Sequence, residues 1–145
     1  MPESDAREIL FICTGNYYRS RFSEALFNFM ATRDDSPWRA FSRGVDIDLA
    51  PPGLSPHTHY ALEQRGIPLA HTTDERHRLT EPDLQRATRA IALKEAEHRA
   101  YIRDQFPAWE ERVEYWHFHD LDCATSDEVI PLIERHVTDL YQSLT

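Results

Sequence analysis

The chain has 145 residues, of which 41% are hydrophobic and 28% are charged. This length and balance are typical of one soluble globular domain, and we expect it to span residues 1–145. The formal net charge of −9 disfavours nucleic acid and anionic membranes as partners, because an acidic surface is repelled by phosphate polymers.

The sequence shows no pattern typical of a membrane or export segment. No stretch approaches the roughly 18 uninterrupted apolar residues of a membrane span. The beginning, "MPESDARE", lacks the basic-then-apolar order of a secretory signal. We therefore expect a cytoplasmic protein without a membrane partner, whose Cys13 and Cys123 are free thiols.

Strands and helices are expected to alternate along the chain. The apolar run at 8–12, "EILFI", precedes a helix at 20–31, and "DLAPPGLSPHTHY" is typical of a long loop. Further strands are expected at 38–44, 88–93 and 112–118, and further helices at about 56–65, 95–104 and 126–144. Pro131 is expected in or near the first turn of the last helix, where a missing amide costs least.

This alternation predicts the fold class. Strands separated by helices imply right-handed crossovers and a parallel sheet. The first strand is apolar throughout, as a central strand buried on both faces should be. The sequence therefore predicts a single-domain α/β three-layer sandwich, with a four-stranded parallel sheet flanked by helices on both faces.

The segment "CTGNYYRS", residues 13–20, joins the first strand to the first helix. A helix amino terminus presents unpaired amides and a partial positive charge, so such a loop is a natural anion cradle. Gly15 is expected to let the backbone turn its N–H groups inward, and Arg19 can hold two oxygens of a tetrahedral oxyanion. These surroundings favour the thiolate form of Cys13, and Ser20 can hydrogen-bond its sulfur. A thiolate under a bound phosphate is a nucleophile aimed at phosphorus.

The alternative interpretation is a buried structural cysteine. A cysteine six positions before an arginine has little specificity as a bare pattern. The context favours the anion site, because Cys13 closes an apolar strand and Arg19 opens a helix.

The stretch "FICTGNYYRS" resembles the signature of the low-molecular-weight protein tyrosine phosphatases, whose phosphate loop reads C-x-G-N-x-x-R-S. A more diffuse likeness extends over nearly the whole chain, through "FSRG", "ALEQRGIPLAH" and "LTEPDLQRATRAIALKEAEHRAYI". The resemblance implies that Cys13 is the nucleophile, Arg19 the oxyanion clamp, Ser20 the thiolate stabiliser and Asn16 the residue that holds the loop in shape.

The resemblance also implies a set of binding and supporting residues. The phosphate-binding residues would be Thr14, Gly15, Asn16, Tyr17, Tyr18, Arg19 and Ser20. Ser42 and His71 would support Asn16 through hydrogen bonds, and His77 competes with His71 for that role.

The chain departs from the family pattern at several positions. Tyr17 and Tyr18 stand where the family often has a small or aliphatic residue followed by a second cysteine. Arg21 replaces the usual proline and should add positive charge close to the anion site. The segment "WHFHDLDCATSDE" should hold the family's Asp-Pro acid loop but contains no Asp-Pro. Asp120 and Asp122 are therefore both candidates for the general acid, and Asp120 is favoured by its spacing from the preceding tryptophan.

Three functions fit these features, and we favour the first. It is a cysteine-dependent phosphatase that forms a cysteinyl-phosphate, needs no cofactor and acts on a phosphorylated protein or a small phosphate ester. The second is a weakly active phosphate-binding module, which the missing Asp-Pro supports. The third is a thiol-coupled arsenate reductase, but Cys123 alone cannot complete a cascade of three thiols. Phosphotyrosine, phosphoarginine and small esters all stay open as substrates, and the oligomeric state stays open as well.

A metal site has little support in the sequence. His117 and His119 alternate on an expected strand beside Asp120. An isolated H-x-H has weak specificity for metal, so we expect no metal.

Overall fold

A computed structural model of the chain describes residues 7–73, 75–120 and 124–145. Its strands form one parallel sheet in the order β2, β1, β3, β4. The strands are β1 (Arg7–Cys13), β2 (Trp38–Gly44), β3 (Arg89–Ala92) and β4 (Glu114–Tyr115). The register of β1 and β2 sets Cys13 opposite Gly44, so both strands end at the same edge of the sheet.

The side chains of β1 alternate between two hydrophobic cores, because successive residues of a strand point to opposite faces of a sheet. Ile9 and Phe11 belong to the core on one face, and Leu10 and Ile12 to the core on the other. All four side chains are fully buried. The apolar composition of β1 is therefore explained by its central place between two helical layers.

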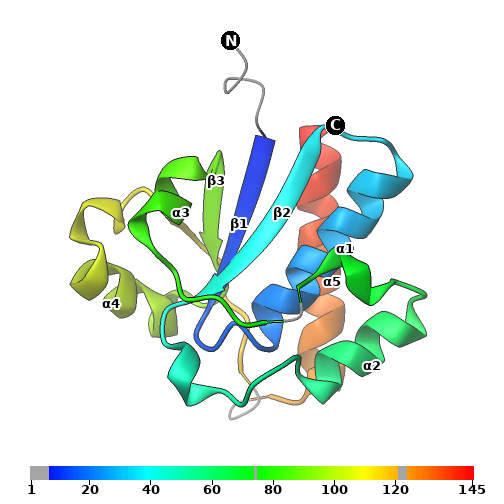
Figure 1. Cartoon of the computed structure of the whole chain (residues 1–145), viewed down its shortest axis with the longest axis horizontal. Coiled ribbons are helices and arrows are strands. Elements are labelled where there is room, and N and C mark those ends of the chain that lie inside the picture. Colours follow the sequence, from blue (N-terminus) through cyan, green and yellow to red (C-terminus); the bar gives the residue numbers. More distant parts are fainter. Residues whose placement is uncertain (1–6, 74, 121–123) are drawn as a thin grey trace.

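Helices cover both faces of the sheet (Figure 1). Within the described residues they are α1 (Arg19–Arg33), α2 (Pro56–Gln64), α3 (Glu81–Arg86), α4 (Glu95–Gln105) and α5 (Ser126–Leu144). Helices α1, α2 and α5 lie on one side of the sheet, and α3 and α4 lie on the other (Figure 1). This arrangement confirms the predicted α/β sandwich with a four-stranded parallel sheet.

The structure differs from the sequence-based expectation in three elements. Helix α3 was not expected, although Thr80 and Asp83 form a capping box at its start. Strand β4 is shorter than the predicted 112–118. Pro131 lies inside α5, near its first turn but in the second one, where a missing amide hydrogen bond costs more. Helix α5 itself starts at Ser126, as expected, where Thr125 and Glu128 form a capping box.

Among the residues that the structure describes, no helix combines the length and the apolar character needed to cross a bilayer.

Candidate active site

The segment 13–20, here called the phosphate loop, lies between β1 and α1 at the carboxyl edge of the sheet. Open parallel sheets bind ligands at this edge. The amino terminus of α1 has no side-chain cap and no acidic residue in its first turn. Its partial positive charge is therefore not neutralised by its own first turn.

The carbonyl groups of the phosphate loop point away from its centre. The backbone N–H groups of Val45, Asp46 and Ser55 donate to the carbonyls of Cys13, Thr14 and Tyr17, at 3.0, 2.8 and 3.0 Å. In contrast, the backbone N–H groups of residues 15–18 donate to no acceptor among the residues that the structure describes. The loop thus has carbonyls tied to its surroundings and amides left available for an oxyanion.

Two glycines allow this loop to pack closely. A Cβ atom on Gly44 would lie 2.6 Å from the Thr14 carbonyl oxygen and 2.8 Å from the Asn16 nitrogen. A Cβ atom on Gly15 would lie 2.5 Å from the Ala50 Cβ. Gly15 is therefore required for close approach to Ala50. The left-handed backbone of the loop falls instead on Asn16, with φ of 51°.

The sulfur of Cys13 is buried and lies 2.9 Å from the Ser20 hydroxyl oxygen. The Asn16 amide donates to that same oxygen at 3.0 Å. The orientation of the Asn16 amide is fixed because its oxygen accepts from the His77 backbone N–H at 2.7 Å. Since Ser20 accepts from Asn16, its own hydrogen is free to point at the sulfur, which is the arrangement that stabilises a thiolate.

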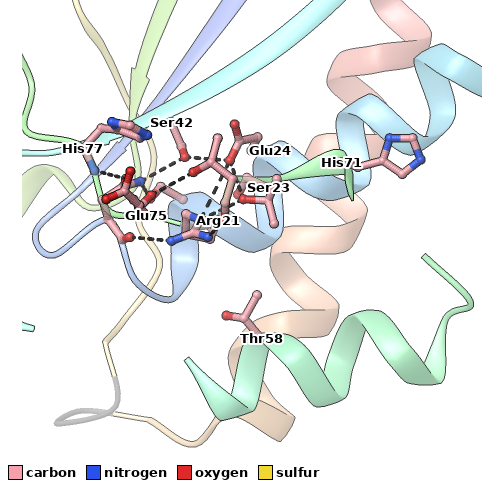
Figure 2. A network of polar contacts seen from close by, with 12 residues as sticks. Arg21, Ser23, Glu24, Ser42, Thr58, His71, Glu75 and His77 are labelled. Carbon is pink, nitrogen blue, oxygen red and sulfur yellow. Dashed lines mark hydrogen bonds and ion pairs between the residues drawn. The ribbon is translucent and has the colours of Figure 1, made fainter. Parts of the chain in front are cut away.

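Of Ser42 and His71, which were both expected to support Asn16, only Ser42 contacts it. Asn16 donates to the Ser42 hydroxyl at 2.9 Å, as the resemblance implied. The ring of His71 instead packs edge-on against Phe29, and in Figure 2 it lies away from the polar network. The expected hydrogen bond from His71 to Asn16 was therefore wrong. The competing candidate, His77, takes that role, through its backbone N–H and not through its side chain.

Arg19 is buried and is held by groups from two other segments. Its NH1 donates to the Phe118 carbonyl at 2.9 Å, and its NH2 donates to Glu97 Oε2 at 2.8 Å. Asp120 Oδ2 lies 3.5 Å from the same NH2. These contacts fix the plane of the guanidinium, and its Nε–H donates to no acceptor among the residues that the structure describes.

Glu97, on α4, was not foreseen from the sequence. Its Oε2 also accepts from the Thr14 hydroxyl and lies 3.1 Å from the His98 Nε2. His98 is oriented by the Lys94 backbone N–H, which donates to its Nδ1 at 3.0 Å, so the proton of the neutral ring lies on Nε2. Burial alone would raise the pKa of Glu97, but the hydrogen bonds from His98 and Arg19 and the Arg19 charge outweigh burial and hold it well below its usual range. Burial lowers the pKa of His98, which favours the neutral ring.

A cavity of about 360 Å³ opens at the phosphate loop. Its lining includes Cys13, Arg19 and Asp120, together with Tyr17, Tyr18 and Tyr101 as aromatic walls. Burial raises the pKa of Tyr18 to about 12, so its phenol is neutral at physiological pH. Of the two candidate acids, Asp120 lies at this cavity, and Asp122 lies outside the described residues.

The family described as "Low molecular weight phosphotyrosine protein phosphatase" matches residues 8–145. The chain belongs to this family. It is 34% identical over 107 residues to the protein-arginine-phosphatase of Bacillus subtilis, covering 73% of this chain and 67% of that protein. It is also 33% identical over 69 residues to arsenate reductase 1 of Staphylococcus epidermidis, covering 48% of this chain and 47% of that protein.

Solved structures agree with this membership. A YwlE arginine phosphatase mutant with a phosphorylated active-site serine matches with a TM-score of 0.78 at 26% identity, over 94% of this chain and 95% of that one. The low-molecular-weight protein tyrosine phosphatase of T. tengcongensis matches with a TM-score of 0.74 at 25% identity, over 95% of this chain and 97% of that one. The chain is therefore a cysteine-dependent phosphatase that acts on phosphorylated substrates.

For a member of this phosphatase family, Arg21 has an unexpected position. The sequence predicted that it adds positive charge close to the anion site. The structure buries it completely in a polar network, shown in Figure 2, where its guanidinium contacts carbonyl and hydroxyl oxygens. The sequence held one indication of this burial: Glu24 lies three positions later on the same helix, at a spacing that allows an ion pair with Arg21.

Proposed function

We propose that Cys13 is the nucleophile of this phosphatase. Its sulfur attacks phosphorus, an S–P bond forms, and the bond from phosphorus to the leaving atom breaks. The amides of residues 15–18 and the Arg19 guanidinium stabilise the equatorial oxygens. Water then attacks phosphorus, the S–P bond breaks, and inorganic phosphate and the Cys13 thiolate are released. The chain of hydrogen bonds from Asn16 through Ser20 to the Cys13 sulfur is the observation that carries this assignment.

We assign the general acid to Asp120. Its carboxylate lies at the cavity and 3.5 Å from Arg19, within reach of a leaving group above the sulfur. In the first step Asp120 gives its proton to the leaving atom, and in the second it accepts a proton from the attacking water. With this acid in place, turnover is favoured over a binding module that only holds phosphate.

For the substrate, we infer a phosphorylated arginine side chain. One relative, over 73% of this chain, is a protein-arginine-phosphatase. The cavity also suits a cationic leaving group, because Asp120 and Glu97 both line it and the three tyrosines offer faces on which a guanidinium can stack. A phosphotyrosine peptide is the competing substrate to compare.

The experiment measures turnover by the purified chain on four substrates: para-nitrophenyl phosphate, phenyl phosphate, a phosphotyrosine peptide and a matched phosphoarginine peptide. We expect metal-independent turnover, with the higher kcat/KM on the phosphoarginine peptide, and no turnover by Cys13→Ser. Asp120→Asn should slow hydrolysis of unactivated phenyl phosphate by roughly a hundredfold, with a smaller loss on para-nitrophenyl phosphate, because a basic leaving group depends more on proton transfer. Wild-type rates in Cys13→Ser would disprove the nucleophile, and equal losses on both esters would remove Asp120 from the role of acid.

A further inference from the structure

Arg21 is a charged side chain with no exposed surface. It is the third residue of α1, and Figure 2 shows its guanidinium within the polar network that includes Glu24 and Ser42. Taking a guanidinium out of water is costly unless its donors find acceptors. Here its Nε donates to the Thr72 hydroxyl at 2.7 Å, its NH1 to the Asn16 carbonyl at 3.2 Å, and its NH2 to the Thr73 carbonyl. The burial of this charge is thus compensated by groups from the phosphate loop and from the segment before α3.

These contacts belong to a closed circuit of hydrogen bonds, here called the rear cluster: Asn16, Arg21, Glu24, Ser42 and Thr72. The Asn16 amide donates to Ser42, which donates to Glu24 Oε1 at 2.8 Å. Arg21 donates to Thr72, which donates to the same Glu24 oxygen at 2.7 Å. Because Arg21 also donates to the Asn16 carbonyl, the circuit begins and ends at Asn16. Both ends of this residue, side chain and main chain, are therefore fixed.

The main-chain contact matters because of the geometry of the peptide that follows Asn16. The described peptides are all trans, and in a planar trans peptide the C=O and the N–H point in opposite directions. Arg21 holds the Asn16 carbonyl on the buried side of the loop. The N–H of the same peptide belongs to Tyr17, and it is therefore turned toward the opposite side, where Tyr17 lines the cavity.

The backbone of Asn16 needs such support. A non-glycine residue at φ of 51° is in the left-handed region, which is less favourable for a residue with a Cβ atom. Rotation of the peptide between Asn16 and Tyr17 would relax this residue and turn the Tyr17 N–H away from the oxyanion. A charged donor on the carbonyl opposes that rotation, and it also polarises the peptide, which strengthens the N–H as a donor.

We propose that Arg21 is a positioning residue, which acts through the Asn16 carbonyl to aim the Tyr17 N–H at the bound phosphoryl group. This inference rests on the proposed function for the identity of the anion, but it concerns oxyanion binding and does not require turnover. It predicts that removal of the Arg21 guanidinium weakens oxyanion binding in a protein that is still folded.

The experiment measures vanadate binding by isothermal titration calorimetry for the wild-type chain, Arg21→Met and a control, Arg33→Met. Arg33 is an exposed arginine at the end of the same helix, paired with Asp34. We expect about tenfold weaker vanadate binding by Arg21→Met, comparable to the loss of one charged hydrogen bond, and unchanged binding by Arg33→Met. Each titration is run below the unfolding temperature of the variant, confirmed by circular dichroism. A folded Arg21→Met with wild-type vanadate affinity would overturn the proposal, whatever its stability.

If Arg21→Met does not fold, Thr72→Val and Thr72→Ser decide the question. Valine keeps the shape of threonine but removes the hydroxyl that joins Arg21 to Glu24. Serine keeps that hydroxyl. Weaker vanadate binding by Thr72→Val, restored in Thr72→Ser, supports the positioning role, and unchanged binding by both contradicts it. If the wild-type chain binds vanadate but hydrolyses no substrate, the proposed function is contradicted, while the positioning role of Arg21 is not.

Discussion

Two arginines, two positions apart, enter two different polar clusters around the phosphate loop. Arg19 belongs to the front cluster, which borders the cavity and consists of Thr14, Arg19, Glu97, His98 and Asp120. Arg21 belongs to the rear cluster. The carboxylate partners differ in exposure, with side chains 26% exposed for Glu97 and 4% for Glu24. One arginine thus faces the substrate side of the loop, and the other faces the protein interior.

The two glutamates show what this difference means electrostatically. Hydrogen bonds and the Arg19 charge hold the pKa of Glu97 below its usual range despite burial. Burial raises the pKa of Glu24, and it outweighs the hydrogen bonds from Thr72 and Ser42 and the charge of Arg21, whose Nε is 4.0 Å away. The front cluster therefore stabilises the ionised form of its carboxylate. The rear cluster instead buries its carboxylate at a cost in free energy. An arginine–glutamate pair thus borders the binding cavity in the front cluster, and another such pair supports the shape of the phosphate loop in the rear cluster.

The largest expected effect separates the two arginines by the same substitution. Arg19→Lys should lower kcat/KM by about a hundredfold to a thousandfold, because an ammonium cannot supply the fork that holds two oxygens. Arg21→Lys should lower kcat/KM much less, because it acts on the oxyanion only through a backbone amide. Steady-state kinetics of both variants test this. Equal losses of kcat/KM in the two variants would contradict the different roles assigned to the front and rear clusters.

A second, smaller effect concerns how Arg19 is held. Glu97→Gln keeps the shape of the side chain but removes the charge that Arg19, Thr14 and His98 share. We expect kcat/KM to fall by about tenfold, as for the loss of a charged hydrogen bond. The matched control is Glu95→Gln on the same helix, where the glutamate is paired with Arg99. Wild-type kinetics in Glu97→Gln would show that the Phe118 carbonyl alone suffices to orient Arg19.

The smallest effect is on the pH dependence of stability, and the two clusters should show opposite signs. The pKa of Glu97 is lower in the folded state than its unfolded value of 4.5. Its ionised carboxylate therefore stabilises the fold at pH values above 4.5, and this stabilisation is lost as the pH falls. Glu24, with a raised pKa, contributes stability below that value, which is lost as pH rises through its folded pKa. From pH 4 to 7, the stability of Glu97→Gln relative to wild type should therefore decrease, by about 1 kcal/mol or less.

Over the same range the stability of Glu24→Gln relative to wild type should increase. Urea unfolding of the wild type and both variants at pH 4, 5.5 and 7 measures these differences. Parallel trends in the two variants would contradict the contrast between the clusters.

The sequence by itself determined the parts of this protein that depend on neighbouring residues. The apolar run of β1 and the alternation of strand and helix patterns along the chain predicted the parallel sheet with helices on both faces, because these signals are local. The phosphate loop was predictable for the same reason. Cys13, Asn16, Arg19 and Ser20 are adjacent in sequence, so their spacing alone indicates an oxyanion site.

Only the tertiary structure decided which distant groups complete the site. Glu97 reaches Arg19 across 78 positions, and the His77 backbone reaches Asn16 across 61. Neither contact has a local pattern. Because a backbone donor leaves no trace in side-chain identity, the sequence could not decide between His71 and His77 as the support of Asn16. The burial of Arg21 was hidden for a related reason. A charged residue next to a predicted anion site is expected to face the anion, but its direction depends on where Thr72 and Glu24 offer acceptors. Those acceptors come together only when the chain has folded.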